Sequence, residues 1–126
     1  MSRRSSREHA LQFLYGQLLN PDIEYDRLGY EEPEADKAYS QGIIAAVNAH
    51  IEEIDAQIST HSHKWSIQQM NKVDVTILRM SVAECLYVPQ ADVNKSIVIN
   101  EALELARQYS GEESVPFING ILNAVL

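Results

Sequence analysis

Apolar side chains recur at every third or fourth position along most of this chain, a spacing that places them on one face of an α-helix. No segment shows the alternation of apolar and polar residues that marks a half-buried β-strand. The pattern therefore predicts an all-α bundle of about six or seven helices without a sheet. The apolar stripes of these helices span residues 11–18, 43–47, 51–58, 67–70, 75–85, 99–106 and 118–125.

Residues that favour helix ends lie between these stripes. Ser5-x-x-Glu8 forms a capping box, which places the start of the first helix at Ser5 or slightly earlier. Pro89 is expected to stop the helix before it, and Ser114 is a good N-cap for the last helix. Residues 21–34 are acidic and contain Pro and Gly, so they are predicted to form a surface connection.

Length and composition predict one domain, residues 1–126, because 126 residues with 45% apolar content can bury a core. No apolar run is long enough to cross a membrane, and no charged stretch followed by an apolar one marks a signal peptide. The single cysteine, Cys85, cannot form an internal disulfide, and its apolar neighbours suggest a buried thiol in a reducing compartment. A cytoplasmic protein is predicted.

The net charge of −8 hides an asymmetry along the chain. Residues 1–8 hold three arginines against Glu8, whereas residues 22–36 hold seven acidic residues against Arg27 alone. Such a chain can bind an anionic ligand at its N-terminal end and repel it elsewhere. The alternative is that these arginines are only solvated, as charges near a terminus often are.

The sequence offers only weak candidates for catalytic or metal-binding residues. His61-x-His63 is the only close histidine pair, and residues two apart on a helix face different ways, so it is expected to be exposed and structural. The five glycines are scattered singly, so no phosphate-binding loop is present. Glu101 and Glu104 are expected to form a solvated helix face. The chain is predicted not to be an enzyme, and neither a metal nor another cofactor is expected.

The N-terminal helix has features that suit single-stranded RNA. Arg3, Arg4 and Arg7 fall within one or two turns, so their guanidinium groups can bind adjacent phosphates. Tyr15 follows Arg7 by two turns, rotated by only about 80° around the helix axis. Single-stranded RNA is recognised by such a combination of charge for the backbone and a ring for an unstacked base. Tyr15 could equally be an aromatic residue at the edge of the core.

Four sequence pieces in a fixed order extend this picture over some 120 residues. They are the arginine-rich helix Arg7-Glu8-His9-Ala10-Leu11-Gln12-Phe13-Leu14-Tyr15, the Trp65 segment leading to Asp74 and Leu78-Arg79, the Asn100-Glu101-Ala102 helix, and Phe117-Ile118-Asn119-Gly120-Ile121-Leu122. Together they resemble the NusB family of bacterial transcription antitermination factors. The resemblance implies two three-helix halves packed across each other. It also implies binding to the single-stranded boxA element of nascent ribosomal RNA leaders, as a heterodimer with NusE, a ribosomal protein of the small subunit. That pair is then expected to join other Nus factors on RNA polymerase.

The resemblance also assigns roles to individual residues. The residues that match the RNA surface of the family are Arg3, Arg4, Arg7, Tyr15, Asp74, Glu113 and Phe117. Asp74 also matches a position near the protein partner, although its place near a helix start would equally suit a helix cap. Asn119-Gly120 is interpreted as structural, with a buried Asn and a Gly that allows close helix approach. Arg79 and Glu84 are each expected to tie neighbouring helices together.

Three departures from the family pattern lower the RNA affinity that we expect. Gln69 stands where an Arg is usual, Asn94 stands where Pro is frequent and is expected to cap its helix, and the basic tail of some relatives does not follow Leu126. RNA affinity of the protein alone is therefore expected to be modest. Two other functions stay open: a helical adaptor that binds only proteins, and an accessory domain of an RNA methyltransferase, which needs a methyl-donor domain downstream. Relatives are expected as monomers or homodimers.

Overall fold

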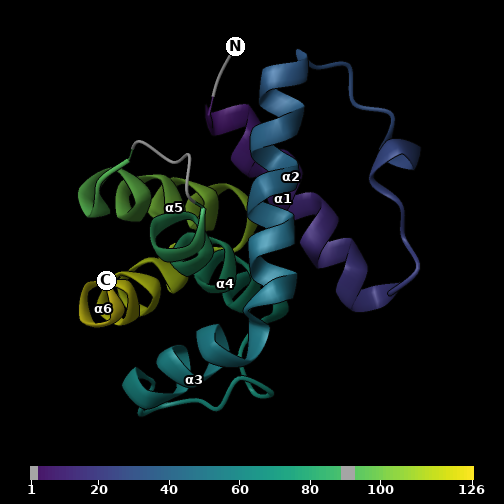
Figure 1. Ribbon diagram of the computed structural model, residues 1–126. Coiled ribbons are helices and arrows are strands. Elements are labelled where there is room, and N and C mark those ends of the chain that lie inside the picture. The colour runs from purple at the N-terminus through teal and green to yellow at the C-terminus, as the bar shows by residue number, and fades with distance from the viewer. Residues whose placement is uncertain (1–2, 89–92) are drawn as a thin grey trace.

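The computed structural model describes residues 3–88 and 93–126, and all regular elements in these ranges are helical (Figure 1). The elements are α1 (Arg3–Leu19), the 3-10 helix η1 (Tyr25–Leu28), α2 (Glu34–Ala49), α3 (Ile51–His61), α4 (Lys72–Tyr87), α5 (Lys95–Tyr109) and α6 (Ser114–Val125). The predicted all-α bundle is confirmed. The expected short helix at 67–70 is a single turn, in which the Met70 N–H donates to the Ser66 carbonyl at 3.1 Å.

Helix α4 lies at the centre and contacts every other α-helix. In Figure 1, α2 runs across the front of α1, α3 lies at the bottom, and α5 and α6 lie on the left. The halves α1–α3 and α4–α6 thus pack across each other, as expected. Because α4 is surrounded by other helices, it is buried almost continuously from Asp74 to Glu84, and its polar side chains there have hydrogen-bond partners.

Side-chain caps fix the starts of α4 and α5. The Asn71 side chain accepts from the N–H groups of Val73 at 2.8 Å and Asp74 at 3.3 Å, so the alternative role of Asp74 as the cap is wrong. The predicted cap at Asn94 is confirmed, because its side chain accepts from the Ile97 N–H at 2.9 Å. The predicted cap at Ser114 is wrong. Ser114 is the first residue of α6, and its hydroxyl is used in a tertiary contact described below.

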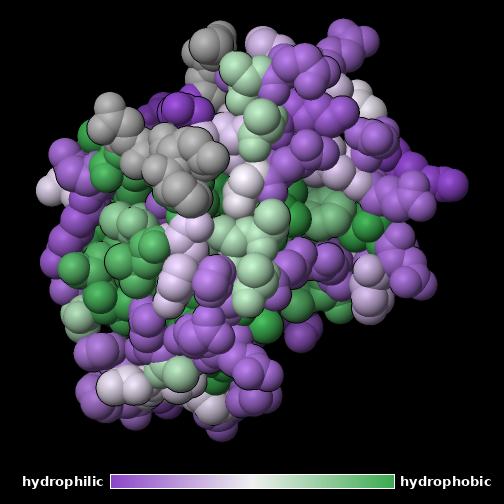
Figure 2. Space-filling model, in the orientation of Figure 1, coloured by the Kyte–Doolittle hydropathy of each residue, from purple (hydrophilic) through white to green (hydrophobic). Residues whose placement is uncertain are grey.

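The connection between α1 and α2 is more than a solvated loop. Ile23, Tyr25 and Leu28 pack against the core, and Gly29 closes η1 with a φ of 72°, in the left-handed region that favours glycine. The Tyr25 hydroxyl donates to Glu32 at 2.8 Å, and burial raises the pKa of Tyr25 to about 12. Most of the acidic side chains remain exposed, and Figure 2 shows mainly hydrophilic residues on the right, where Figure 1 places this connection.

Two predicted helix–helix ties are confirmed. Arg79 on α4 donates to Asp55 on α3 through Nε and Nη2, both at 2.9 Å, and Glu84 on α4 pairs with Arg7 on α1. The structural interpretation of Asn119-Gly120 is wrong, because both residues are exposed and a Cβ at Gly120 would meet nothing within 4 Å.

Two other positions are more exposed than predicted. Leu18, expected in the apolar stripe of α1, is 41% exposed, and Cys85 is only half-buried. None of the described helices is long and apolar enough to cross a membrane.

Candidate nucleic-acid interface

Arg7 is not part of an exposed arm. Its guanidinium lies inside the molecule with 4% of the residue exposed, and donates to Glu84 from Nε at 2.8 Å and from Nη2 at 2.6 Å. The Tyr39 hydroxyl also donates to Glu84, so this cluster joins α1, α2 and α4. Burial opposes the charged form of Arg7, but the hydrogen bonds and negative charge of Glu84 outweigh it and raise the pKa of Arg7. The expected contact of Arg7 with phosphate would require this buried pair to open.

Arg4 lies at the surface but already has a carboxylate partner. It donates to Glu101 on α5 from Nε at 3.0 Å and from Nη2 at 2.8 Å, a bidentate pair whose Arg4 side chain is 64% exposed. This hydrogen-bonded pairing holds the pKa of Glu101 below its usual value. A phosphate that binds Arg4 therefore competes with Glu101.

Arg3 is the exposed arginine of this group with no carboxylate partner among the described residues. Its guanidinium lies over the ring of Tyr39, 3.7 Å from the ring centroid, in a cation–π contact. Tyr39 thus receives Arg3 on its face while its hydroxyl donates to Glu84. The N–H groups of Arg3 remain at the surface, where a phosphate can reach them.

Tyr15 lies half-buried further along α1, at a pocket of about 300 Å³. The other residues that line this pocket are Leu11, Gln12, Val73 and Tyr109. The Gln12 side chain is fixed at its edge, because it donates to the Tyr109 hydroxyl at 3.1 Å and accepts from Tyr30. Tyr15 is thus neither fully exposed nor a core residue, and one part of its ring is open to a ligand.

Asp74 sits beside this pocket with a different set of contacts. It is 6% exposed and accepts from the Ser110 hydroxyl at 2.7 Å and the Ser114 hydroxyl at 2.8 Å. These bonds fasten the start of α4 to the junction of α5 and α6. In the described geometry, both carboxylate oxygens of Asp74 are engaged inside the protein.

Glu113 and Phe117 come from that same junction. Glu113 is exposed and its side chain folds back, so that a Cβ built at Gly111 would lie 2.8 Å from the carboxylate oxygens. Phe117 is half-buried against the core. Asp74 thus lies between the Tyr15 pocket and the α5–α6 junction, which carries Glu113 and Phe117.

Sequence reasoning missed the partners of the arginines. The sequence predicts a solvated Glu101 and does not indicate the contacts of Tyr39, Gln12 and Tyr109. A signal for Arg7 was present, because Arg7, Ala10, Leu11 and Leu14 share the spacing of one helix face.

The histidine pair shows no metal-binding arrangement. His61 Nδ1 lies 3.0 Å from the Gln57 carbonyl and His63 is exposed. No cluster of three or more His, Cys, Asp or Glu side chains suited to a metal occurs within residues 3–88 and 93–126.

Comparison with known proteins agrees with the resemblance seen in the sequence. A model of the NusB family matches residues 4–126. The transcription antitermination protein NusB of Lysinibacillus sphaericus is 36% identical and aligns over 98% of this chain and 95% of its own length. That of Finegoldia magna is 39% identical, over 100% of this chain and 94% of its own. A solved structure of antitermination factors NusB and NusE in complex with dsRNA superposes with a TM-score of 0.83 and 26% identity, covering 98% of this chain and 94% of that chain.

Proposed function

The chain belongs to the NusB family, and we propose that it is a transcription antitermination factor that binds RNA together with the ribosomal protein NusE. In this proposal the RNA is the single-stranded boxA element of nascent ribosomal RNA leaders. The protein works in the cytoplasm, where the pair joins other Nus factors on RNA polymerase.

One observation carries the proposal: the chain matches, over nearly its whole length, a structure described as NusB and NusE in complex with dsRNA. The match covers 98% of this chain, whose helices α1, α4 and α6 carry Arg3, Arg4, Tyr15, Asp74 and Phe117. Because that complex contains duplex RNA, a test must compare single-stranded with double-stranded RNA.

The described contacts divide the predicted RNA residues into three groups. Arg3, Arg4, Tyr15 and Glu113 have exposed or half-exposed side chains that can touch RNA. Arg7 and Asp74 are buried and hydrogen-bonded, so we assign them the role of positioning the helices that carry the others. Phe117 is half-buried beside Ser114 and completes the surface at α6.

The adaptor function remains the second candidate because of one observation. Arg4 is held by Glu101 and Arg7 by Glu84, so two of the three arginines already have carboxylate partners within the protein. If the arm does not bind phosphate, the NusE-binding surface would be the whole function.

The test measures binding of labelled boxA-like RNA, single-stranded and duplex, with and without the cognate NusE, over a range of salt concentrations. The variant Arg3→Gln with Arg4→Gln leaves the buried Arg7 intact. For a single strand, the slope of log K against log salt should fall by about 0.7 for each lost phosphate contact, or about 1.4 in total. The control Arg27→Gln with Arg107→Gln removes the same charge from exposed sites elsewhere. No RNA binding even with NusE would favour the adaptor.

A further inference from the structure

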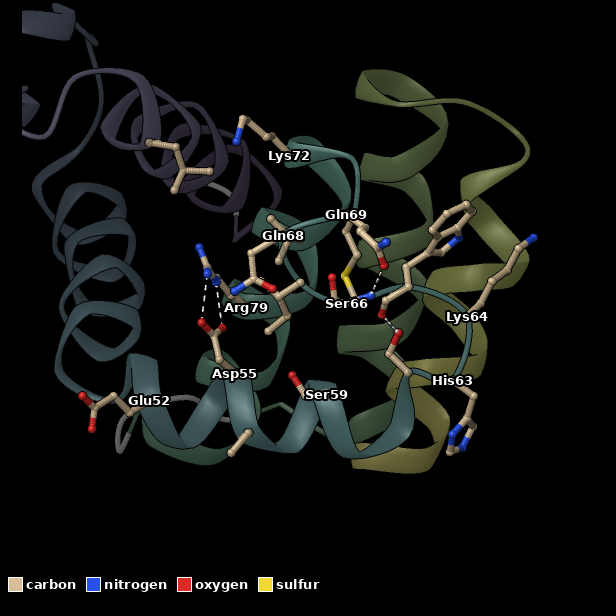
Figure 3. A pocket seen from close by; sticks show the side chains of 17 residues that line it. Glu52, Asp55, Ser59, His63, Lys64, Ser66, Gln68, Gln69, Lys72 and Arg79 are labelled. Atoms are coloured by element: carbon tan, nitrogen blue, oxygen red, sulfur yellow. Dashed lines mark hydrogen bonds and ion pairs between the residues drawn. The ribbon is translucent and has the colours of Figure 1, made fainter.

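A broad groove lies at the far end of α1 from the arginine arm. Its volume is about 920 Å³, and it is enclosed by α3, the start of α4, the end of α1 and the 62–71 segment (Figure 3). In Figure 3 the Arg79–Asp55 pair and Gln68 lie towards its middle, with Lys64 at one rim and Lys72 at another. Trp65, which follows Lys64 in the chain, also lines the groove. The residues assigned above to the RNA surface do not include Trp65, Lys64 or Lys72.

The cations of this groove are available to a ligand. Six of the ten Lys and Arg side chains form ion pairs with carboxylates, namely Arg4, Arg7, Arg27, Lys37, Arg79 and Arg107. Arg3, Lys64, Lys72 and Lys95 form none with the described carboxylates. Two of these four unpaired cations therefore line one groove of a protein whose net charge is −8.

The acidic side chains of the groove do not cancel the positive charge of Lys64 and Lys72. Asp55 is neutralised by two hydrogen bonds from Arg79, whose remaining guanidinium nitrogen points away from Asp55 in Figure 3. Glu52 is exposed at the edge farthest from Lys64. A polyanion can therefore follow the rim from Lys72 to Lys64 without meeting an unpaired carboxylate on the floor.

Trp65 supplies an aromatic surface next to these charges. It is 43% exposed, and Lys64 Nζ lies over one face of its ring, 5.5 Å from the centroid, which leaves the other face for a base. The segment that carries it is held in place, because the Ser62 hydroxyl donates to the Trp65 carbonyl at 2.5 Å and the Gln69 side chain accepts from the Ser66 N–H at 3.0 Å. An exposed ring on a segment whose backbone is held, next to cations without carboxylate partners, is an arrangement on which bases of single-stranded nucleic acid stack.

The groove is continuous with the proposed RNA surface. Leu18, at its edge, lies one helical turn beyond Tyr15 on α1, and Lys72 directly precedes Val73 of the Tyr15 pocket. Arg3 and Leu18 are separated by roughly 22 Å along α1. A strand held by Arg3 at one end and passing Tyr15 would reach Lys72 next.

We propose that this Trp65 groove is a second RNA-binding surface, which takes nucleotides of the same single strand beyond those held by the arginine arm. Trp65 stacks on a base, and Lys64 and Lys72 contact phosphates. This inference rests on the proposed function, because it assumes that RNA is bound along α1.

Trp65 is the only tryptophan of the chain, so its fluorescence reports on this groove alone. The experiment titrates the protein with a short boxA-like RNA and with the same RNA extended at both ends, and follows binding separately by the anisotropy of a dye on the RNA. The extended RNA should bind more tightly and quench Trp65. Trp65→Ala should weaken binding of the extended RNA by about tenfold, whereas Trp65→Phe should keep most of the affinity.

The charge part of the proposal has its own variant. Lys64→Gln with Lys72→Gln should lower the salt slope for the extended RNA by about 1.4 and leave the short RNA unchanged. Lys95→Gln is the matched control, because Lys95 is also exposed and unpaired with a described carboxylate but lies outside the groove. Thermal melting of each variant confirms that it folds.

The outcomes separate this inference from the proposed function. RNA that binds without quenching Trp65, and with no effect of the lysine variants, would overturn the groove proposal and leave the function intact. If the lysine variants weakened NusE binding but not RNA binding, the groove would be a protein surface and the proposal would also be wrong. If neither the short nor the extended RNA binds, with or without NusE, both the groove proposal and the proposed RNA-binding function are wrong.

Discussion

At the scale of single residues, three arginines within two turns of one helix have three different environments. Arg3 lies on an aromatic ring, Arg4 shares an exposed pair with Glu101, and Arg7 is buried against Glu84. The depth of each side chain decides which phosphate contacts it can make. Arg4 is the intermediate case, because its partner can be exchanged for a phosphate without opening the core.

The first prediction concerns this exchange. Glu101→Gln removes the carboxylate that competes with phosphate for Arg4, so RNA affinity at low salt should rise by about two- to fivefold. Glu101 also lies 3.6 Å from Arg7 Nη1, so a melting curve must accompany the measurement. Glu104→Gln, which removes an exposed acid on the same helix, is the control. An equal gain in both variants would show that only net charge matters.

The second prediction concerns the Tyr15 ring. If a base stacks on its open part, Tyr15→Ala should cost about 1–3 kcal/mol of RNA binding, while Tyr15→Phe should cost little. Because Tyr15 is only half-buried, thermal stability should fall modestly in the alanine variant. RNA binding and thermal melting of both variants are measured together. A large drop in melting temperature with unchanged RNA affinity of the folded protein would show that Tyr15 is a packing residue.

At the scale of elements, the Arg7–Glu84 pair is the polar link through which α1 is fixed to the central helix. Glu84 accepts from Arg7 and from Tyr39, so one carboxylate holds two helices against α4. The charge of a buried pair is tolerable only while both partners remain. The orientation of α1, and with it the position of Arg3 and Tyr15, depends on this pair.

The third prediction follows from that dependence. Glu84→Gln keeps the shape of the side chain but leaves the Arg7 charge buried without its counter-ion, and should lower the free energy of unfolding by about 3–5 kcal/mol. Urea denaturation measures the change. Glu24→Gln removes the exposed partner of Arg27 and should change stability by less than about 1 kcal/mol. A comparable effect of the two changes would contradict the structural role of Glu84.

The elements themselves were largely predictable from the sequence, because helix spacing and caps such as Asn94 are local signals. The errors arose where a distant residue decides the outcome. Arg7 pairs with a residue 77 positions later, and Ser114 gives up capping because Asp74 on another helix accepts its hydroxyl. Asn119-Gly120 is exposed instead of buried, because α6 turns these two residues to the surface.

At the scale of the whole molecule, the net charge of −8 is spread so that few cations are free. Among the described residues, three of the four cations without a carboxylate partner lie at the arm (Arg3) and at the Trp65 groove (Lys64 and Lys72), while the connection between α1 and α2 carries exposed acids. The family and the fold could be recognised from the sequence, but the pairing of Arg4, Arg7 and Arg79 with their acidic partners could not, because it depends on contacts between helices. The protein alone should therefore bind RNA only modestly.

The last prediction is that RNA and NusE bind with positive coupling. A basic ribosomal protein that docks beside Asp74, next to the Tyr15 pocket, would extend the positive surface that this chain provides only sparsely. Coupling between two ligands is reciprocal, so RNA must tighten NusE binding by the same factor by which NusE tightens RNA binding, and we expect about 1–3 kcal/mol. Titrations of RNA into the protein alone and into the heterodimer, and of NusE into the protein with and without RNA, close the cycle. Equal dissociation constants in all arms would mean that the two ligands bind independently, and the sparse cations of this chain would then have to account for RNA affinity unaided.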